Sequence, residues 1–442
     1  MTSSNPLRND ELQAYWMPFT PNKAFKAKPR LLESAAGLYF TTDDGRQVID
    51  GSSGLWCSAL GHGHPKVTEA IREQAGKLDY STAFGFGHRP AFELANVVAD
   101  VMPGSLDHVF FTNSGSESVD TALKIAIAYH RLKGDASRTR LIGRFNGYHG
   151  VGFGGISVGG MVNNRKFFGS LLPGVDHMPF PYDPATMAFT NGQPETGAAY
   201  ADELENLVKL HDASTIAAVI VEPVVGSAGV FIPPIGYLER LREITAKHGI
   251  LLIFDEVITA FGRLGYASAA ERFKVEPDII TTAKAINNGT VPMGAVIVQK
   301  RIYDTFMDET KGGVELFHGY TYSAHPLAVA AALATQKVFK EEGVYENVQT
   351  LEPHFGAAAH GLKTAKHVTD IRNLGFMSAF TVAQRDGVLG ARANDVFLKA
   401  FEMGLKVRLS GDHIAIAPPL VSDKAHIDRI FNLFAETLAA VD

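Results

Sequence analysis

Short hydrophobic runs alternate with helix-like segments through the middle of the chain. Candidate strands, rich in β-branched and aromatic residues, lie at 108–112, 140–144, 217–221, 251–254, 278–282 and 295–298. The intervening segments repeat apolar residues at helical spacing, as Val119, Ala122, Leu123 and Ala126 do. This alternation predicts an α/β fold, with a mostly parallel sheet and helices on its faces. Ligands of such sheets bind outside the carboxyl ends of the strands, so residues there are the first functional candidates.

The last quarter of the chain has a different pattern. A long helix is expected over 327–342, and short strands follow near 378–382 and 413–417. Near the start, residues 37–50 are typical of a hairpin with its turn at Asp43-Asp44-Gly45. A chain of 442 residues also exceeds the roughly 250–300 that a single core organises. The predicted division is an N-terminal segment (1–60) packed with a small α+β domain (327–442), and a large domain (61–326).

Composition narrows the class of protein. The chain is 46% hydrophobic and 20% charged, as expected of a globular α/β enzyme. A formal charge of −6 and a pI near 6.2 provide no basic field, so we expect a metabolite and no nucleic acid as partner. The polar first ten residues do not resemble a signal peptide, and no apolar run approaches the roughly 20 residues of a membrane span. With Cys57 as its only cysteine, the chain is predicted to be cytoplasmic.

Two strand ends carry the residues of most chemical interest. Lys284 follows an apolar strand, where loss of water lowers the pKa of an amine and makes it a nucleophile for carbonyl compounds. Asp255 ends the buried run Leu251-Leu252-Ile253-Phe254, 29 residues earlier. A carboxylate there could keep a pyridine nitrogen protonated. The alternatives are a lysine that extends to solvent and an aspartate that caps a helix. Together the two residues favour a pyridoxal 5'-phosphate (PLP) site.

Two further segments suit such a cofactor. Ser114-Gly115-Ser116-Glu117 follows a predicted strand and opens a helix, where small residues and backbone N–H groups can surround a phosphate. Tyr148, in Phe145-Asn146-Gly147-Tyr148-His149-Gly150, offers an aromatic face for a flat ring. Each segment alone is weak, because Ser-Gly-Ser turns often bind nothing and the tyrosine could belong to the core.

Other motifs are discounted. Residues 150–155 match GxGxxG, but a dinucleotide site needs a strand directly before the glycines and a helix directly after them. His62 and His64 suggest a metal, yet no Cys or His cluster completes a ligand set, so we expect structural histidines and no metal.

In combination, the motifs resemble the class III (ω-)aminotransferases, which are PLP enzymes of fold type I, over nearly the whole chain. The resemblance is carried by Ser114-Gly115-Ser116-Glu117, Tyr148-His149-Gly150, Glu222-Pro223, Asp255-Glu256-Val257, Phe261-Gly262-Arg263, Lys284 and Tyr320-Thr321-Tyr322-Ser323, in family order and spacing. It implies that Lys284 binds PLP covalently, that Asp255 contacts the pyridine nitrogen, and that Tyr148 and Val257 enclose the ring. The remaining cofactor-binding residues that it implies are Ser114, Gly115, Ser116, His149, Glu222, Tyr320 and Thr321.

The resemblance also has implications for substrates and assembly. Ile258-Thr259-Ala260 stands where ornithine- and γ-aminobutyrate-type relatives commonly have Gln-Thr-Gly, which favours the β-alanine:pyruvate and amine:pyruvate branch. There Arg408 would pair with the carboxylate of an α-keto acid acceptor. Thr321 would reach the phosphate of a neighbouring subunit, which implies a homodimer or a dimer of dimers with sites at the subunit interface. The residues implied around the amine donor are Phe19, Trp56, Phe84, Phe86 and Tyr148.

Competing functions remain open on sequence alone. Lys284 and Asp255 would equally serve an aminomutase or a decarboxylase, and 2-oxoglutarate could replace pyruvate as acceptor. A PLP-binding regulator would need an added DNA-binding module, and none is visible. A nicotinamide-dependent dehydrogenase depends only on the discounted glycine motif. The donor could be β-alanine, a longer ω-amino acid, a polyamine or a simple amine.

Overall fold

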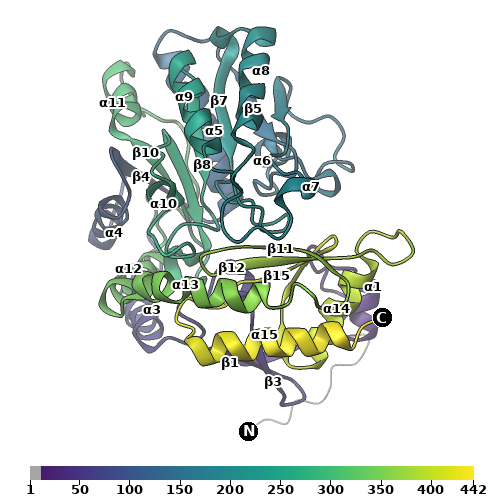
Figure 1. The fold of residues 1–442 in the computed structure, drawn as a ribbon. Helices are drawn as coiled ribbons and strands as arrows, with labels where there is room; N and C mark the ends of the chain where they lie inside the picture. The colour runs from purple at the N-terminus through teal and green to yellow at the C-terminus, as the bar shows by residue number, and fades with distance from the viewer. Residues whose placement is uncertain (1–10) are drawn as a thin grey trace.

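A computed structural model describes residues 11–442 of the chain. Figure 1 shows two parts. The larger, in the upper half of the view, surrounds a seven-stranded sheet. The smaller, in the lower half, contains a four-stranded antiparallel sheet with the long C-terminal helix along its base. A third sheet, also four-stranded, joins N-terminal strands to one late strand.

The large sheet has the order β4-β10-β9-β8-β7-β5-β6. Only β10 runs antiparallel to its neighbours, so the predicted mostly parallel α/β sheet is confirmed. The strands are β4 (Leu106–Thr112), β5 (Arg140–Arg144), β6 (Val175–Met178), β7 (Ile216–Val221), β8 (Leu251–Asp255), β9 (Ile279–Ala283) and β10 (Gly294–Gln299). Each predicted strand is present within two residues of its expected ends, whereas β6 was not predicted.

Period-two alternation in the central strands gives both sheet faces an apolar surface. In β8, Leu251 and Ile253 pack in the cluster that includes α5 (Gly115–Leu132) and α11 (Lys300–Glu309). Leu252 and Phe254 pack in the other cluster, with α9 (Tyr237–His248). Burying each such side chain stabilises the fold by about 1.5–3 kcal/mol. The same alternation places Asp255 on the α5 side.

The smaller sheet has the order β11-β12-β15-β14, and β1-β2-β3-β13 forms the N-terminal sheet. The predicted hairpin is present as β2 and β3, and β3 pairs in parallel with β13 through Ile49 and Leu405. The N-terminal hairpin is thereby joined to a strand of the last part of the chain. The strands are β1 (Leu32–Ala36), β2 (Tyr39–Thr42), β3 (Gln47–Asp50), β11 (Val368–Leu374), β12 (Met377–Val382), β13 (Leu405–Lys406), β14 (Arg408–Ser410) and β15 (His413–Ile416).

Helices surround these sheets (Figure 1). The expected long helix is α12, which packs on α3 and α4. No helix in the part of the chain that the structure describes is long and apolar enough to cross a membrane. The predicted domain boundaries stay a prediction. The remaining helices are α1 (Asn22–Ala27), α2 (Ser53–Trp56), α3 (Pro65–Lys77), α4 (Arg89–Asp100), α6 (Phe153–Val158), α7 (Pro184–Met187), α8 (Glu203–His211), α10 (Ala269–Phe273), α12 (Pro326–Glu341), α13 (Val344–His360), α14 (Ala391–Glu402) and α15 (Lys424–Ala439).

Candidate active site

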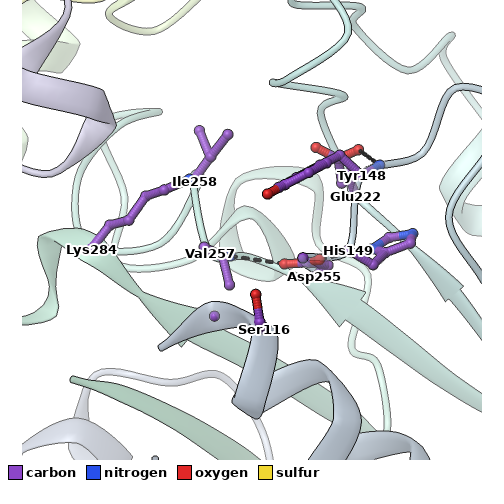
Figure 2. Close-up of a pocket in the computed structure, with 10 residues that line it drawn as sticks. Ser116, Tyr148, His149, Glu222, Asp255, Val257, Ile258 and Lys284 are labelled. Carbon is purple, nitrogen blue, oxygen red and sulfur yellow. Dashed lines mark hydrogen bonds and ion pairs between the residues drawn. The ribbon is translucent and has the colours of Figure 1, made fainter. Parts of the chain in front are cut away.

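A cavity lies at the carboxyl ends of the large sheet (Figure 2). The segments that form it are the start of α5, the loop after β5, the end of β7, the end of β8 and the residue after β9. Most of the predicted cofactor-binding residues therefore meet in one place. The lining residues are Gly115, Ser116, Tyr148, His149, Gly150, Glu222, Asp255, Val257, Ile258 and Lys284.

Asp255 is held in a fixed orientation at the end of β8. One carboxylate oxygen lies 2.7 Å from Nδ1 of His149. The other accepts hydrogen bonds from the backbone N–H of Val257 and the hydroxyl of Thr281, both at 3.2 Å. The residue is buried, with 6% of its surface exposed, and it lines the cavity. Such an oriented carboxylate suits a positively charged ring nitrogen.

Lys284 follows β9 and faces the same cavity (Figure 2). Its backbone has a φ of 50°, a left-handed conformation that turns the chain sharply at the strand end. Burial lowers the pKa of the Lys284 amine from 10.5 to about 8. The positive charge of Arg408 lowers it further, whereas Cys57, Asp255 and Glu222 act in the opposite direction. The neutral, nucleophilic fraction of this amine near neutral pH is therefore much larger than that of an ordinary lysine.

The start of α5 forms a narrow end of the cavity that admits only small side chains. A Cβ atom on Gly115 would lie 2.8 Å from Val257 Cγ1, and one on Gly150 would lie 2.4 Å from Ser116 Oγ. Ser116 Oγ also accepts a hydrogen bond from the N–H of Val151 at 3.1 Å. Ser114 does not line the cavity, because it caps α5 by accepting the N–H of Glu117 at 3.2 Å. The close backbone approach at a helix N-terminus fits a phosphate group.

Tyr148 and Glu222 form the opposite wall. Glu222 Oε1 accepts the backbone N–H of Tyr148 at 2.9 Å, and its Oε2 accepts the N–H of Gly226 at 3.0 Å. Burial raises the pKa of the Glu222 carboxyl, and the nearby Asp255 carboxylate adds to the rise. Burial also raises the pKa of Tyr148. The Tyr148 ring and the Val257 side chain both border the cavity and leave space for a flat ring (Figure 2).

Arg408 lies on β14 and lines a second, larger cavity together with Phe19 and Leu55. Burial lowers the pKa of its guanidinium, and its Nε has no hydrogen-bond partner within residues 11–442. Its charge acts on Tyr148 and Glu222, so the two cavities are electrostatically linked. A half-buried guanidinium whose Nε lacks a partner among residues 11–442 suits a ligand carboxylate.

Trp56 does not line either cavity. It is only 2% exposed and lies under the guanidinium of Arg263, 6.0 Å from the ring centroid. Its neighbour Leu55 is 50% exposed instead. Phe19 is 79% exposed at the rim of the second cavity. A direct role for Trp56 and Phe19 in substrate binding stays a prediction.

Four predicted site residues lie outside both cavities: Thr321, predicted to reach a neighbouring subunit, Tyr320, predicted to bind the cofactor, and Phe84 and Phe86, predicted around the donor. Thr321 is exposed, and its carbonyl oxygen accepts the hydroxyl of Tyr80 at 3.1 Å. The hydroxyl of Tyr320 lies 3.1 Å from that of Thr121 on α5. Phe84 packs against Gly319, and Phe86 is 74% exposed. One chain alone therefore does not bring this group to the Lys284 cavity.

Sequence reasoning assigned no site role to Gly150 and Cys57, although both are near the chemistry. Gly150 lines the cavity, and the Cys57 thiol interacts electrostatically with Lys284. The close packing of Gly150 on Ser116 explains part of the glycine-rich stretch that was discounted as a dinucleotide motif. His62, considered as a metal ligand, pairs with Asp50 at 2.8 Å. No group of three or more His, Cys, Asp or Glu residues suited to a metal occurs in the described part of the chain.

Comparison with known proteins gives one consistent result. Residues 22–438 match the family model "Aminotransferase class-III". The chain is 55% identical to an omega-aminotransferase of Caulobacter vibrioides, over 98% of this chain and 99% of that protein. It is 50% identical to a beta-alanine–pyruvate aminotransferase of Pseudomonas aeruginosa, over 97% and 96% respectively. Among solved structures, it superposes with a TM-score of 0.93 and 30% identity on an omega transaminase from Pseudomonas jessenii in complex with PMP, covering 98% of both chains.

Proposed function

Because the chain belongs to the class-III aminotransferase family, we propose that it moves an amino group from an ω-amino acid or amine of the β-alanine type to pyruvate, with PLP as cofactor. The family expected from the sequence motifs is thereby confirmed. The observation that carries the proposal is the pairing of a neutralisable amine, Lys284, with an oriented carboxylate, Asp255, on one cavity. The PMP complex of the solved relative supports the cofactor.

Bound PLP would supply an electron sink for the pair of electrons left when a C–H bond of the substrate breaks. Lys284 would hold the cofactor through Nζ and would be released when a donor amine takes its place. The freed Nζ then takes the proton from the amine-bearing carbon of the donor, as a general base with a pKa of about 8 can do near neutral pH. The second half of the cycle uses the same groups in reverse with pyruvate, so we expect ping-pong kinetics.

The other lining residues hold the cofactor and exclude water. Asp255, oriented by His149, would keep the ring nitrogen protonated, and Tyr148 and Val257 would enclose the ring. The narrow end formed by Gly115 and Ser116 takes the phosphate. Glu222, held by two backbone N–H groups, keeps the Tyr148 loop in place.

Arg408 sets the choice of acceptor. Its unpaired guanidinium would bind the carboxylate of pyruvate in a bidentate manner. Ile258 lines the cavity where the resemblance places glutamine in ornithine- and γ-aminobutyrate-type relatives, so at this position the chain follows the pyruvate-using branch. This favours pyruvate over 2-oxoglutarate.

We infer that the active enzyme is a homodimer in which Thr321 enters the partner's site. The exposed positions of Thr321 and its aromatic neighbours support this inference. Mixing two defective variants tests it: Lys284→Ala lacks the amine, and Thr321→Val lacks the phosphate contact. If Thr321 acts on the partner, mixed dimers regain one intact site and activity rises above that of either variant. If Thr321 acts within its own chain, mixing restores nothing.

A donor panel assayed with both acceptors tests the function itself. We expect alanine to form from pyruvate with β-alanine, longer ω-amino acids or simple amines, and much slower turnover with 2-oxoglutarate. Lys284→Ala is the control and should neither become yellow with PLP nor turn over. Equal or faster turnover with 2-oxoglutarate would contradict the acceptor assignment, and full activity of Lys284→Ala would contradict the whole site.

A further inference from the structure

A buried arginine of the smaller sheet contacts the backbone of a loop from the larger sheet. Arg372 on β11 donates two hydrogen bonds to the carbonyl oxygen of Gly229, from Nε at 3.0 Å and from Nη2 at 2.8 Å. The guanidinium carbon lies 4.2 Å from the ring centroid of Phe231, so the arginine also stacks on the same loop. The side chain is 3% exposed. This contact has two donors on one acceptor and excludes water, so it fixes the loop tip in both distance and direction.

Asp370, two residues earlier on β11, completes the contact. Its carboxylate pairs with Arg372 and accepts the hydroxyl of Tyr182. It also accepts the backbone N–H of Phe189 at 2.6 Å. Tyr182 and Phe189 lie in the segment after β6. Since the buried arginine charge is paired, the cluster avoids the large cost of an isolated buried ion.

The loop held by Arg372 packs at its base against two residues that line the cofactor cavity. Residues 225–231 make a short hairpin closed by two backbone hydrogen bonds between Val225 and Phe231, at 3.0 and 2.9 Å. At the base, the N–H of Gly226 donates to the carboxylate of Glu222. A Cβ on Gly226 would lie 2.4 Å from Ile258 Cδ1. Glu222 and Ile258 both line the cavity, so the position of the hairpin sets one wall.

The same cluster adjoins the strand of Arg408. Arg372 Nη2 lies 3.4 Å from Nδ1 of His413, at the start of β15. A Cβ on Gly229 would lie 2.7 Å from the His413 ring, so hairpin and strand are in direct contact. β15 in turn pairs with β14 through Ala415 and Arg408. The cluster therefore joins the Glu222 wall to the strand that presents the acceptor-binding arginine.

We propose that Arg372 is a positioning residue for transamination: by holding Gly229 it sets the distance between the Glu222–Ile258 wall and Arg408, and thereby the size of substrate that the site accepts. The proposal rests on the proposed function, because it concerns the same cavity. The contact between Arg372 and Gly229 should not affect the phosphate end of the cavity, because none of the contacts described for Arg372 and its hairpin involves Gly115, Ser116 or Gly150.

Arg372→Lys tests the proposal, because lysine can still pair with Asp370 but cannot give the two-donor contact to Gly229. We expect kcat/KM for β-alanine with pyruvate to fall about tenfold, the effect of losing one hydrogen bond from a charged donor. A bulkier donor such as 1-phenylethylamine should lose less, so the ratio of the two kcat/KM values should shift toward the bulky amine by about fivefold. PLP affinity should stay within twofold of the wild type.

Two further variants make the test decisive. Arg385→Lys is the matched control, because Arg385 lies after β12 in the same part of the chain and its side chain forms an exposed ion pair with Asp395. It should leave all constants unchanged. Phe231→Leu removes the stacked ring on the hairpin side and should shift the donor ratio in the same direction, which decides the matter if Arg372→Lys does not fold.

Unchanged kinetics of Arg372→Lys, or equal losses for both donors with weaker PLP binding, would overturn the positioning role. Failure of the proposed function would look different, because the wild-type protein itself would then form no alanine from pyruvate.

Discussion

Capture of PLP by the cofactor-free protein should depend on pH through one side chain. Burial lowers the pKa of Lys284 from 10.5 to about 8. At pH 7 about one amine in ten is then neutral, compared with roughly one in 3000 for an ordinary lysine. The reactive fraction is thus larger by about 300-fold. The rate of capture should rise about tenfold per pH unit between pH 6 and 7 and level off above pH 8.

The measurement is a series of rapid-mixing experiments with cofactor-free protein and PLP from pH 6 to 10, followed by the yellow colour of the bound cofactor. Reduction with borohydride and peptide mapping then identifies the modified residue as Lys284. Arg408 contributes to the lowered pKa, so Arg408→Met should move the midpoint upward. Glu222 acts in the opposite direction, so Glu222→Gln should move it downward. Titration of free PLP is common to all variants and cancels in these comparisons.

A midpoint near 10 would refute the idea that a desolvated amine accounts for the reactivity. Identical midpoints in all three proteins would refute the electrostatic account of the cavity. Lys284→Ala serves as the blank, since it should yield no reducible adduct.

Three further perturbations test separate parts of the site. Gly115→Ala places a Cβ 2.8 Å from Val257, and overpacking of about 1–3 kcal/mol should weaken PLP binding by about 5- to 150-fold in a spectroscopic titration. Gly76→Ala adds a Cβ in open space and should leave PLP binding unchanged. Arg408→Ala should raise the KM for pyruvate by about 10- to 100-fold while a carboxylate-free amine is little affected; equal losses would remove its acceptor role. Lys284→Met should raise the free energy of unfolding of the cofactor-free protein at pH 7 by up to about 3 kcal/mol. The unfolded chain binds more protons than the folded one between pH 8 and 10.5, so wild-type stability rises over that window and the difference between the urea midpoints should vanish by pH 10.5.

The sheet was predictable from sequence where strands are buried on both faces. Leu251 to Phe254 are apolar at every position, so the local sequence alone predicts a strand buried on both faces. β6 was missed because it lies at the sheet edge and is short, with two adjacent polar residues, Asp176 and His177, between Val175 and Met178. Asp176 and His177 make their contacts with Arg140 and Arg165, which local sequence does not reveal.

The cofactor cavity was foreseeable because its residues follow strands whose carboxyl ends converge. The environment of Trp56 was not. Ser53, Gly54 and Trp56 all have positive φ, which turns Trp56 into the core and Leu55 outward. That conformation depends on Asp50, which accepts the N–H of Gly54, and on Arg263, which bonds Ser53 from more than 200 residues away. Periodicity within a short window carries no information about such partners.

Two free-energy costs to the folded state fall on Lys284. Its left-handed backbone costs roughly 1–2 kcal/mol for a residue with a Cβ, and its lowered pKa adds a desolvation cost of about 3 kcal/mol while the amine is charged. A glycine would relieve the first cost and an apolar side chain the second, but neither would supply an amine at the end of β9. The flanking strands offset both costs, because β8 and β9 are buried along their whole length and fix the chain on either side. Both costs are present in the cofactor-free protein when the Lys284 amine carries a charge. Binding of PLP to this amine removes the charge from the buried site, so we expect PLP to stabilise the fold.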